Sequence, residues 1–251
     1  MLLRRLNQHI KNQNWFAVGL DLLIVVVGVY IGLQVQQWTN DREREQREAK
    51  YLERLHEEAV RTSELREDNV ARRINTLNDL GAAHEFLISK EESNGLSPST
   101  CLALVLVTVM TKVTADLPTV AELLSAGQLD TLGSADIRSS VVRLIQVTDR
   151  GNDALDGITR GVTPLYRRYP DLIQIRGSAD RIDSDFEYWG PECNGAAMRE
   201  NRSFLNDFVD FHLRYGAAVA IIKRESEELG RLHLSLDQAL GIEHPDEVEA
   251  P

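Results

Sequence analysis

The sequence predicts an all-α protein in which one N-terminal transmembrane helix runs into a long juxtamembrane helix and a helical bundle. Residues 15–33 form an apolar run, no proline occurs in residues 1–97, and apolar residues then recur at intervals of three and four. The predicted parts are a basic tail (1–14), a transmembrane anchor (15–38), a helical soluble domain (39–240) and an acidic disordered tail (241–251).

The apolar run at 15–33 has the length of a membrane-spanning helix. At about 1.5 Å per residue it spans roughly 28 Å, close to a hydrocarbon thickness of about 30 Å. Trp15 and Trp38 bracket it, as aromatic residues do at the two membrane interfaces. A cleaved signal peptide is the alternative, but the run is longer than in such peptides and residues 34–38 contain no small-residue cleavage site. We therefore expect an uncleaved anchor.

The charges before the anchor favour a single-pass topology with the N-terminus in the cytoplasm and the C-terminal domain in the periplasm. Arg4, Arg5 and Lys11 precede the helix without any acidic residue, whereas the basic residues after it alternate with acids. A count of Lys and Arg alone does not favour this orientation, since acids contribute little to that rule. The prediction rests on the unmixed basic tail, which is typical of a signal anchor.

Three residues within the apolar run are candidates for contacts with a partner helix. Gly28 and Gly32 are four residues apart, a spacing that lets two membrane helices approach closely, although glycine is also common in membrane helices generally. Asp21 either reaches the near headgroup region or makes a polar contact in the membrane, because a bare carboxylate there costs about 1–3 kcal/mol.

The charge distribution argues against a nucleic-acid partner. The formal net charge is −11, while residues 1–33 hold three basic residues against one acid, so the acidic excess lies in the soluble domain. A domain this acidic repels phosphate backbones. We expect no binding of DNA or RNA.

The first helix of the soluble domain is predicted to continue from the anchor over residues 39–90. Its apolar stripe indicates a face that packs in the core rather than a dimer seam. The stripe consists of Leu52, Leu55, Ala59, Thr62 and Leu65, continued by Ile74, Leu77 and Leu80.

Further helices follow between turn signals. Residues 101–110 are apolar all round, which predicts the most buried helix, with a buried strand as the alternative. Thr119 and Glu122 form a capping-box pattern, and Gly127 is placed to cap the end of that helix. The remaining predictions are a helix from Ser134 to about Thr163, a short helix or extended piece over 165–175, a long loop over 176–200 and a last helix over about 201–240.

Two cysteines, Cys101 and Cys193, are candidates for a disulfide that ties the 176–200 loop to the buried helix. The alternative is two reduced, buried thiols in the cytoplasm. The disulfide depends on the periplasmic topology, because disulfides persist in oxidising compartments.

The anchor contains an acidic residue, then an aliphatic run with glycine, then Leu-Gln and a tryptophan. These residues are Asp21, Leu22, Val25, Gly28, Ile31, Leu33, Gln34 and Trp38. Together with residues 51–55 and 119–132, it resembles a family of uncharacterised bacterial inner-membrane proteins. Asp21 stands where that family usually has glutamate, and Gly32 where it usually has alanine. The resemblance implies an anchor in the bacterial inner membrane and a helical domain of unknown function, and it supplies no catalytic residue.

No catalytic, metal-binding or cofactor-binding motif is recognised in the sequence. HxxxH, CxxC, GxSxG, GxxxxGK[ST] and GxGxxG are all absent. His212 near Asp207 and Asp210, and the basic aromatic patch at 166–169, are interpreted as solvated surface. We therefore predict a protein that is not an enzyme and has no metal or cofactor.

These features together predict a non-enzymatic interaction or scaffold module anchored at the bacterial inner membrane. Its expected partners are the lipid bilayer and another membrane or envelope protein, or a second copy of the chain. The alternative is a periplasmic sensor-like domain that binds a small ligand, in which the helices around residues 101–163 enclose an apolar pocket.

Overall fold

A computed structural model of the chain describes residues 15–88, 96–110, 112, 116–176 and 190–243. Helices predominate in this part of the chain, and its strands form a two-stranded antiparallel sheet, so the predicted all-α class is confirmed. Two compact units are present, Met1–Tyr51 and Leu52–Pro251.

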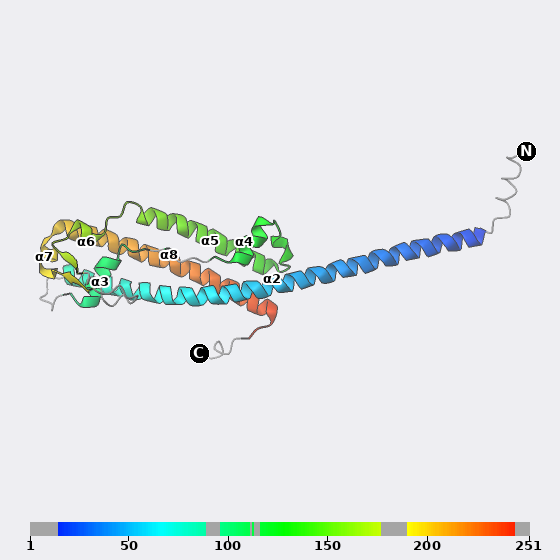
Figure 1. Cartoon of the computed structure of the whole chain (residues 1–251), viewed down its shortest axis with the longest axis horizontal. Coiled ribbons are helices and arrows are strands. Elements are labelled where there is room, and N and C mark those ends of the chain that lie inside the picture. The colour runs from blue at the N-terminus through cyan, green and yellow to red at the C-terminus, as the bar shows by residue number, and fades with distance from the viewer. Residues whose placement is uncertain (1–14, 89–95, 111, 113–115, 177–189, 244–251) are drawn as a thin grey trace, which may run out of the picture. The chain divides into compact units, whose positions relative to one another are not determined.

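The elements appear in the order shown in Figure 1. They are α2 (Trp15–Ile88), α3 (Pro98–Leu106), α4 (Pro118–Ser125), the short 3-10 helix η1 (Leu129–Thr131), α5 (Ala135–Thr159), α6 (Leu165–Arg168), β1 (Ile173–Arg176), β2 (Gly190–Cys193), α7 (Gly195–Glu200) and α8 (Arg202–Leu240).

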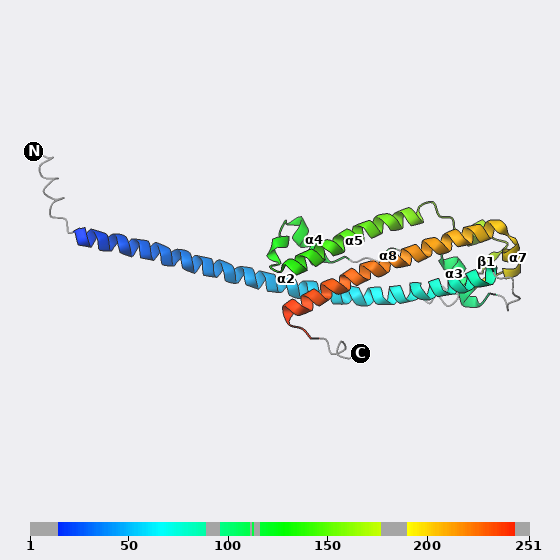
Figure 2. The same ribbon diagram turned by 180° about the vertical axis from the view of Figure 1, so that it is seen from behind.

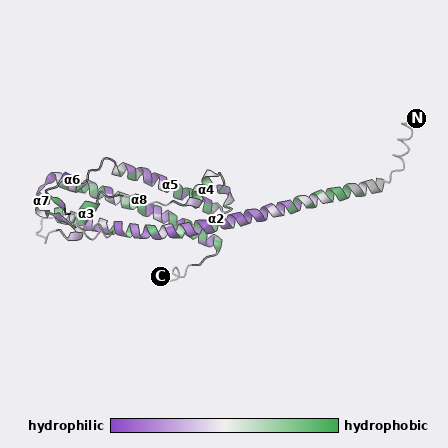
Figure 3. Cartoon of the chain, in the orientation of Figure 1, coloured by the Kyte–Doolittle hydropathy of each residue, from purple (hydrophilic) through white to green (hydrophobic). Residues whose placement is uncertain are grey.

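The first unit contains an exposed apolar stretch of α2. Its large hydrophobic side chains from Leu20 to Trp38 are 46–66% exposed. Figure 3 shows this apolar stretch giving way to a hydrophilic one farther along α2. By length and composition, the helix from Leu22 onward can cross a membrane, and its apolar window is not buried within the described structure.

In the second unit, α5 and α8 lie side by side, as Figures 1 and 2 both show. The buried face of α8 alternates in steps of four and three residues over its whole length, the pattern of a helix that packs along a seam. The residues in these steps are Phe204, Phe208, Phe211, Tyr215, Ala218, Ile222, Glu225, Leu229, Leu232 and Leu236, and Val219, Glu228 and Asp237 are buried beside them.

The buried face of α2 differs from the predicted stripe. Leu65 and Ile74 are 64% and 37% exposed, and the neighbouring Arg66 and Arg73 are buried instead. Six buried residues recur at a spacing of seven, namely Leu52, Ala59, Arg66, Arg73, Leu80 and Leu87, and Leu55, Glu58 and Ala83 are buried beside them. The predicted stripe contained only the apolar residue of each turn. In the structure the seven-residue spacing continues, and an arginine can occupy a buried position of that spacing where its charge has a partner.

The largest hydrophobic cluster lies where α3, α6, α7 and the sheet cover the end of the α2–α8 pair (Figure 1). The prediction of a helix for the apolar run from Cys101 holds as far as Leu106, where α3 ends. Cys101, Ala103 and Leu104 are buried there, but Val109, beyond the helix, is exposed. The buried-strand alternative for this run is therefore wrong.

Two predicted helix starts had different outcomes. Ser134 caps α5 by accepting a hydrogen bond from the Ile137 backbone N–H, as predicted. Thr119 does not cap α4, which begins at Pro118 after Leu117. The Thr119 backbone N–H instead donates a hydrogen bond to the carboxylate of Glu58 on α2.

Two predicted boundaries are corrected. The helix α5 ends at Thr159 rather than near Thr163, because the backbone becomes extended at Arg160, and Gly161 then adopts a positive φ of 72°. The predicted loop over 176–200 contains β2, which pairs with β1 in the register Ile173–Cys193, and also the short helix α7. Residues 177–189 of that loop, the basic tail 1–14 and residues 244–251 of the acidic tail lie outside the described chain.

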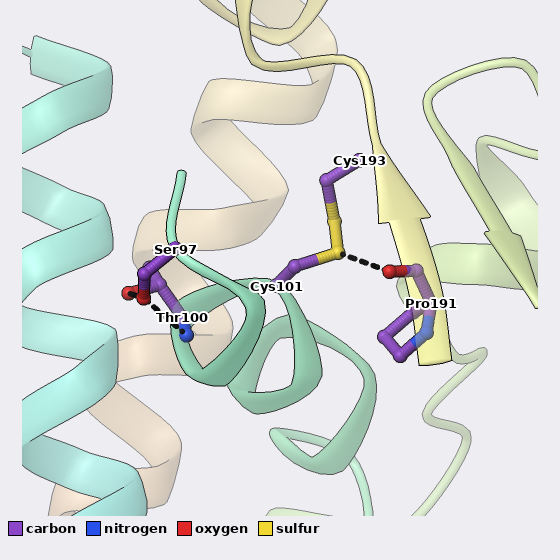
Figure 4. Close-up of a disulfide and its surroundings, with 5 residues drawn as sticks. All are labelled: Ser97, Thr100, Cys101, Pro191 and Cys193. Carbon is purple, nitrogen blue, oxygen red and sulfur yellow. Dashed lines mark hydrogen bonds between the residues drawn. A yellow bond between two sulfur atoms is a disulfide. The ribbon is translucent and has the colours of Figure 1, made fainter. Parts of the chain in front are cut away.

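Figure 4 shows that the predicted cysteine pair is brought together, with the Sγ atoms of Cys101 and Cys193 2.00 Å apart. The Cys101 Sγ also lies 3.3 Å from the carbonyl oxygen of Pro191. The pair joins α3 to β2 across a sequence separation of 92 residues. The loop from Gly190 is thus fastened to the hydrophobic cluster.

We expect a reductant to lower the free energy of unfolding of the full chain. Opening a closed loop of this length releases chain entropy worth about 4–5 kcal/mol. Denaturant unfolding followed by circular dichroism, with and without reductant, measures the change. A Cys101→Ser/Cys193→Ser variant should be equally stable in both conditions. A reductant effect of the same size in that variant would contradict the prediction.

Candidate functional site

The anchor candidates are distributed along the exposed part of α2. Gly28 and Gly32 each face open space, since a Cβ added at either residue would have no other atom within 4 Å. Trp38 is exposed, and the Arg42 guanidinium lies 4.3 Å from the centre of its ring. The side chains of Trp15 and Asp21 lie outside the described structure.

A groove of about 350 Å³ lies between α4 and α5. It falls in the part of the chain where the sequence predicted a pocket as the alternative to a scaffold. Its walls are mostly aliphatic, and two carboxylates and a hydroxyl accompany them. The lining residues are Asp116, Leu117, Pro118, Val120, Ala121, Leu124, Leu144, Ile145, Thr148 and Asp149.

Three polar groups give this groove its chemistry. Asp116 and Asp149 are exposed carboxylates. The hydroxyl oxygen of Thr148 is buried, and it makes no hydrogen bond within the described part of the chain. This oxygen has almost no accessible surface, so a ligand could bond to it only if the groove opened further. The groove therefore suits an apolar molecule that carries a positive charge.

The α4 wall of the groove is held by side chains of α2. The Glu58 carboxylate accepts hydrogen bonds from the backbone N–H of Thr119 at 3.0 Å and from its hydroxyl at 2.8 Å. A negative charge is favourable at a helix N-terminus, where backbone N–H groups lack helical partners. Arg54 forms a second link, an ion pair of 2.8 Å with Glu122.

A buried ion pair lies farther along α2. The Arg66 guanidinium donates to Glu225 Oε2 at 2.9 Å and to the Ile222 carbonyl at 3.0 Å, and its Nε donates to Ser226 at 3.0 Å. The side chains of Arg66 and Glu225 are only 1% and 3% exposed. Burial raises the pKa of Glu225, and the hydrogen bonds and charge of Arg66 oppose that rise.

The direction of the pKa shift of Glu225 determines how the stability of the fold changes with pH. A carboxyl group whose pKa is raised in the folded state binds its proton more tightly there than in the unfolded chain. The contribution of Glu225 to stability is therefore largest in acid and falls as the pH rises through the raised pKa.

Helix α5 approaches this ion pair through a glycine. A Cβ on Gly151 would lie 2.1 Å from Glu225 Oε1 and 3.0 Å from Cγ2 of Ile221. Real Cβ atoms do not approach other atoms as closely as the first of these distances. Gly151 thus allows α5 to pack against α8 at the level of the buried pair.

The other sequence candidates are engaged in structural contacts. Arg168, from the basic aromatic patch, forms an ion pair with Asp207, and the Tyr169 hydroxyl donates to the same oxygen at 2.6 Å. Burial raises the pKa of Asp207, but the hydrogen bonds from Tyr169 and Arg168 outweigh it and lower the pKa overall. The charge of Arg168 is therefore paired, while Arg167 of the same patch is exposed.

His212 packs against aromatic rings rather than against the aspartates near it in sequence. Its ring lies 5.6 Å from that of His84 and 5.8 Å from that of Phe208, measured between ring centres. Burial, with a smaller effect of His84, lowers the pKa of His212. Asp210 forms an ion pair with Arg214.

Sequence reasoning missed a cluster of His56, His233 and Asp237, which the structure brings together between α2 and α8. The HxxxH pattern does not occur at His233, because the fourth residue after it is an aspartate. The HxxxD spacing on α8 was the available signal. His56 lies 177 positions from His233, so only the tertiary structure adds it to the pair.

Comparison with known proteins found no match to this chain among family models, curated proteins or solved structures. The resemblance to a bacterial inner-membrane family stays a prediction. Function must therefore be argued from the residues themselves.

We expect Gly151→Ala to destabilise the chain by about 1–3 kcal/mol, because the added methyl group overpacks the contact with Glu225. Gly157→Ala is the matched control, since this α5 glycine faces open space and alanine favours a helix by up to about 1 kcal/mol. Denaturant unfolding of both variants measures the difference. If Gly151→Ala is as stable as Gly157→Ala, the close approach does not constrain the packing.

Proposed function

We propose that this chain is a membrane-anchored, sensor-like helical domain that binds a small amphipathic cation in the groove between α4 and α5. The observation that carries the proposal is the composition of the groove. Mostly aliphatic walls border about 350 Å³, and Asp116, Thr148 and Asp149 are among the lining residues. Small-molecule sites combine such an apolar lining with a few polar groups that orient the ligand.

The charge of the domain supports a cationic ligand. The chain carries a net charge of −11, which attracts cations and repels anions at long range. At short range, Asp116 and Asp149 provide negative charge at the groove itself. A fatty acid or a phosphate ester would be repelled by the net charge at long range and by the two carboxylates at the groove.

The proposed location is the bacterial inner membrane, with the N-terminus in the cytoplasm and the domain in the periplasm. The exposed apolar helix from Leu22 supports the anchor. The cysteine pair at disulfide distance supports an oxidising compartment, because disulfides persist there and are rare in the cytoplasm. The unmixed basic tail supports the orientation.

The ligand proposal is tested with two small naphthyl probes, one carrying an ammonium group and the other a carboxylate. Titration calorimetry on the full chain in lipid nanodiscs, with empty nanodiscs as the blank, should give saturable binding of the ammonium probe only. Ala121→Phe should weaken that binding at least tenfold, because this exposed alanine lines the groove and phenylalanine fills it.

The matched control is Ala154→Phe, an exposed alanine of α5 that does not line the groove. It should bind the probe as the parent chain does. Asp149→Asn should weaken binding roughly two- to fivefold, the effect of one partly exposed ion pair. Equal binding of both probes, or an equal loss in Ala121→Phe and Ala154→Phe, would contradict a cation site in this groove.

A second candidate function is a non-enzymatic interaction module that associates through its anchor. The observation that favours it is the open space beside both Gly28 and Gly32, which share one helix face one turn apart. Small residues at this spacing allow close packing of membrane helices. The occupant we propose is the anchor of a second copy of the chain.

Gly28→Ile should reduce self-association of the full chain in bilayers several-fold, as measured by energy transfer between labelled copies. Gly19→Ile is the control, because Gly19 also faces open space but lies about 180° around the helix from Gly28. An unchanged signal in Gly28→Ile, or the same decrease in both variants, would exclude this packing face.

A further inference from the structure

We propose that His56, His233 and Asp237 bind a divalent transition-metal ion, with zinc as the best fit, between α2 and α8. This inference does not depend on the proposed ligand groove. It also opposes the expectation from the sequence that the chain has no metal site.

Three donor atoms converge on one point in this cluster. Nε2 of His56 lies 3.3 Å from Nε2 of His233 and 2.8 Å from Oδ1 of Asp237. Nε2 of His233 lies 3.5 Å from the same carboxylate oxygen. Each of the three residues thus places an atom that can ligate a metal within 3.5 Å of those of the other two.

These separations can be compared with those around zinc. Zinc bonds to imidazole nitrogen and carboxylate oxygen are about 2.0–2.2 Å, so two ligands of a tetrahedral ion are roughly 3.3–3.5 Å apart. The distances from His233 to His56 and to Asp237 match this spacing. The contact between His56 and Asp237 is shorter and must lengthen by about half an ångström to admit an ion.

A hydrogen-bonded pair accounts for the short contact between His56 and Asp237, but it does not account for all three separations at once. One N–H on His56 Nε2 can point toward the Asp237 oxygen or toward His233, but not toward both. An ion accepts a lone pair from each of the three atoms at once. The convergence of all three separations is therefore the feature that points to a metal.

The ligand set also indicates the class of ion. Two imidazoles and one carboxylate suit zinc and neighbouring transition metals, whereas calcium and magnesium prefer oxygen ligands. The side chains of His56, His233 and Asp237 are 15%, 22% and 7% exposed, so an ion can enter from solvent and is then largely enclosed. Three protein ligands leave a fourth position for water or an external donor.

The three ligands come from elements that already pack together. His233 and Asp237 are one turn apart on α8, which places them on the same helix face. His56 comes from α2, four residues after Leu52, the first buried apolar residue of this unit. Binding of the ion would fasten the C-terminal part of α8 to α2 and stabilise the folded state.

The test is titration calorimetry of zinc into the full, tag-free chain in nanodiscs, with a large excess of magnesium present. We expect one zinc ion per chain and a rise in melting temperature of roughly 5–10 °C when zinc is at about 100 times its Kd. His56→Gln, His233→Gln and Asp237→Asn should each weaken zinc binding at least tenfold.

The matched control is His84→Gln/His212→Gln, which removes another neighbouring histidine pair from the same two helices. Zinc affinity should be unchanged in that variant. No zinc binding by the parent chain, unchanged binding in the ligand variants, or an equal loss in the control would overturn the proposal.

A measurement on the parent chain keeps the test decisive if a ligand variant does not fold. Diethyl pyrocarbonate modifies free imidazole rings, and mass spectrometry identifies the modified residues. Zinc should protect His56 and His233 from modification and leave the reactivity of His84 and His212 unchanged. Modification of His56 and His233 at the same rate with and without zinc would overturn the proposal.

Discussion

The buried ion pair between Arg66 and Glu225 sets the register in which three helices of the second unit pack. Arg66 comes from α2 and Glu225 from α8, while Gly151 brings α5 against the same carboxylate. Separating two buried charges costs far more than a surface pair contributes, so a shift of either helix along the other is strongly disfavoured. Apolar residues at these positions would tolerate such a shift more easily.

The antiparallel α2–α8 pair is fastened at three levels along its length. His56 meets Asp237 near the start of this part of α2, Arg66 meets Glu225 in the middle, and Leu80 lies in the large cluster around α3. Polar contacts define the first two levels and hydrophobic packing the third. Hydrophobic burial supplies most of the stability, and the polar contacts make one alignment of the helices preferred.

The candidate groove depends on the same helix. Glu58 and Arg54 of α2 hold the α4 wall, and α5 forms the other wall while packing against α8 through Gly151. A molecule that separates α4 from α5 would therefore strain contacts made by α2.

The helical class, the exposed apolar helix, the cap at Ser134 and the cysteine pair could be predicted from the sequence, because each depends on local periodicity, a local hydrogen bond or the presence of two cysteines. The predictions for Leu65 and Thr119 were wrong, since burial of Arg66 and the hydrogen bonds to Glu58 depend on residues far away in the chain. The groove and the His56, His233 and Asp237 cluster could be found only in the folded structure. Their residues come from different helices, and the distances between helices are set by packing rather than by any local pattern.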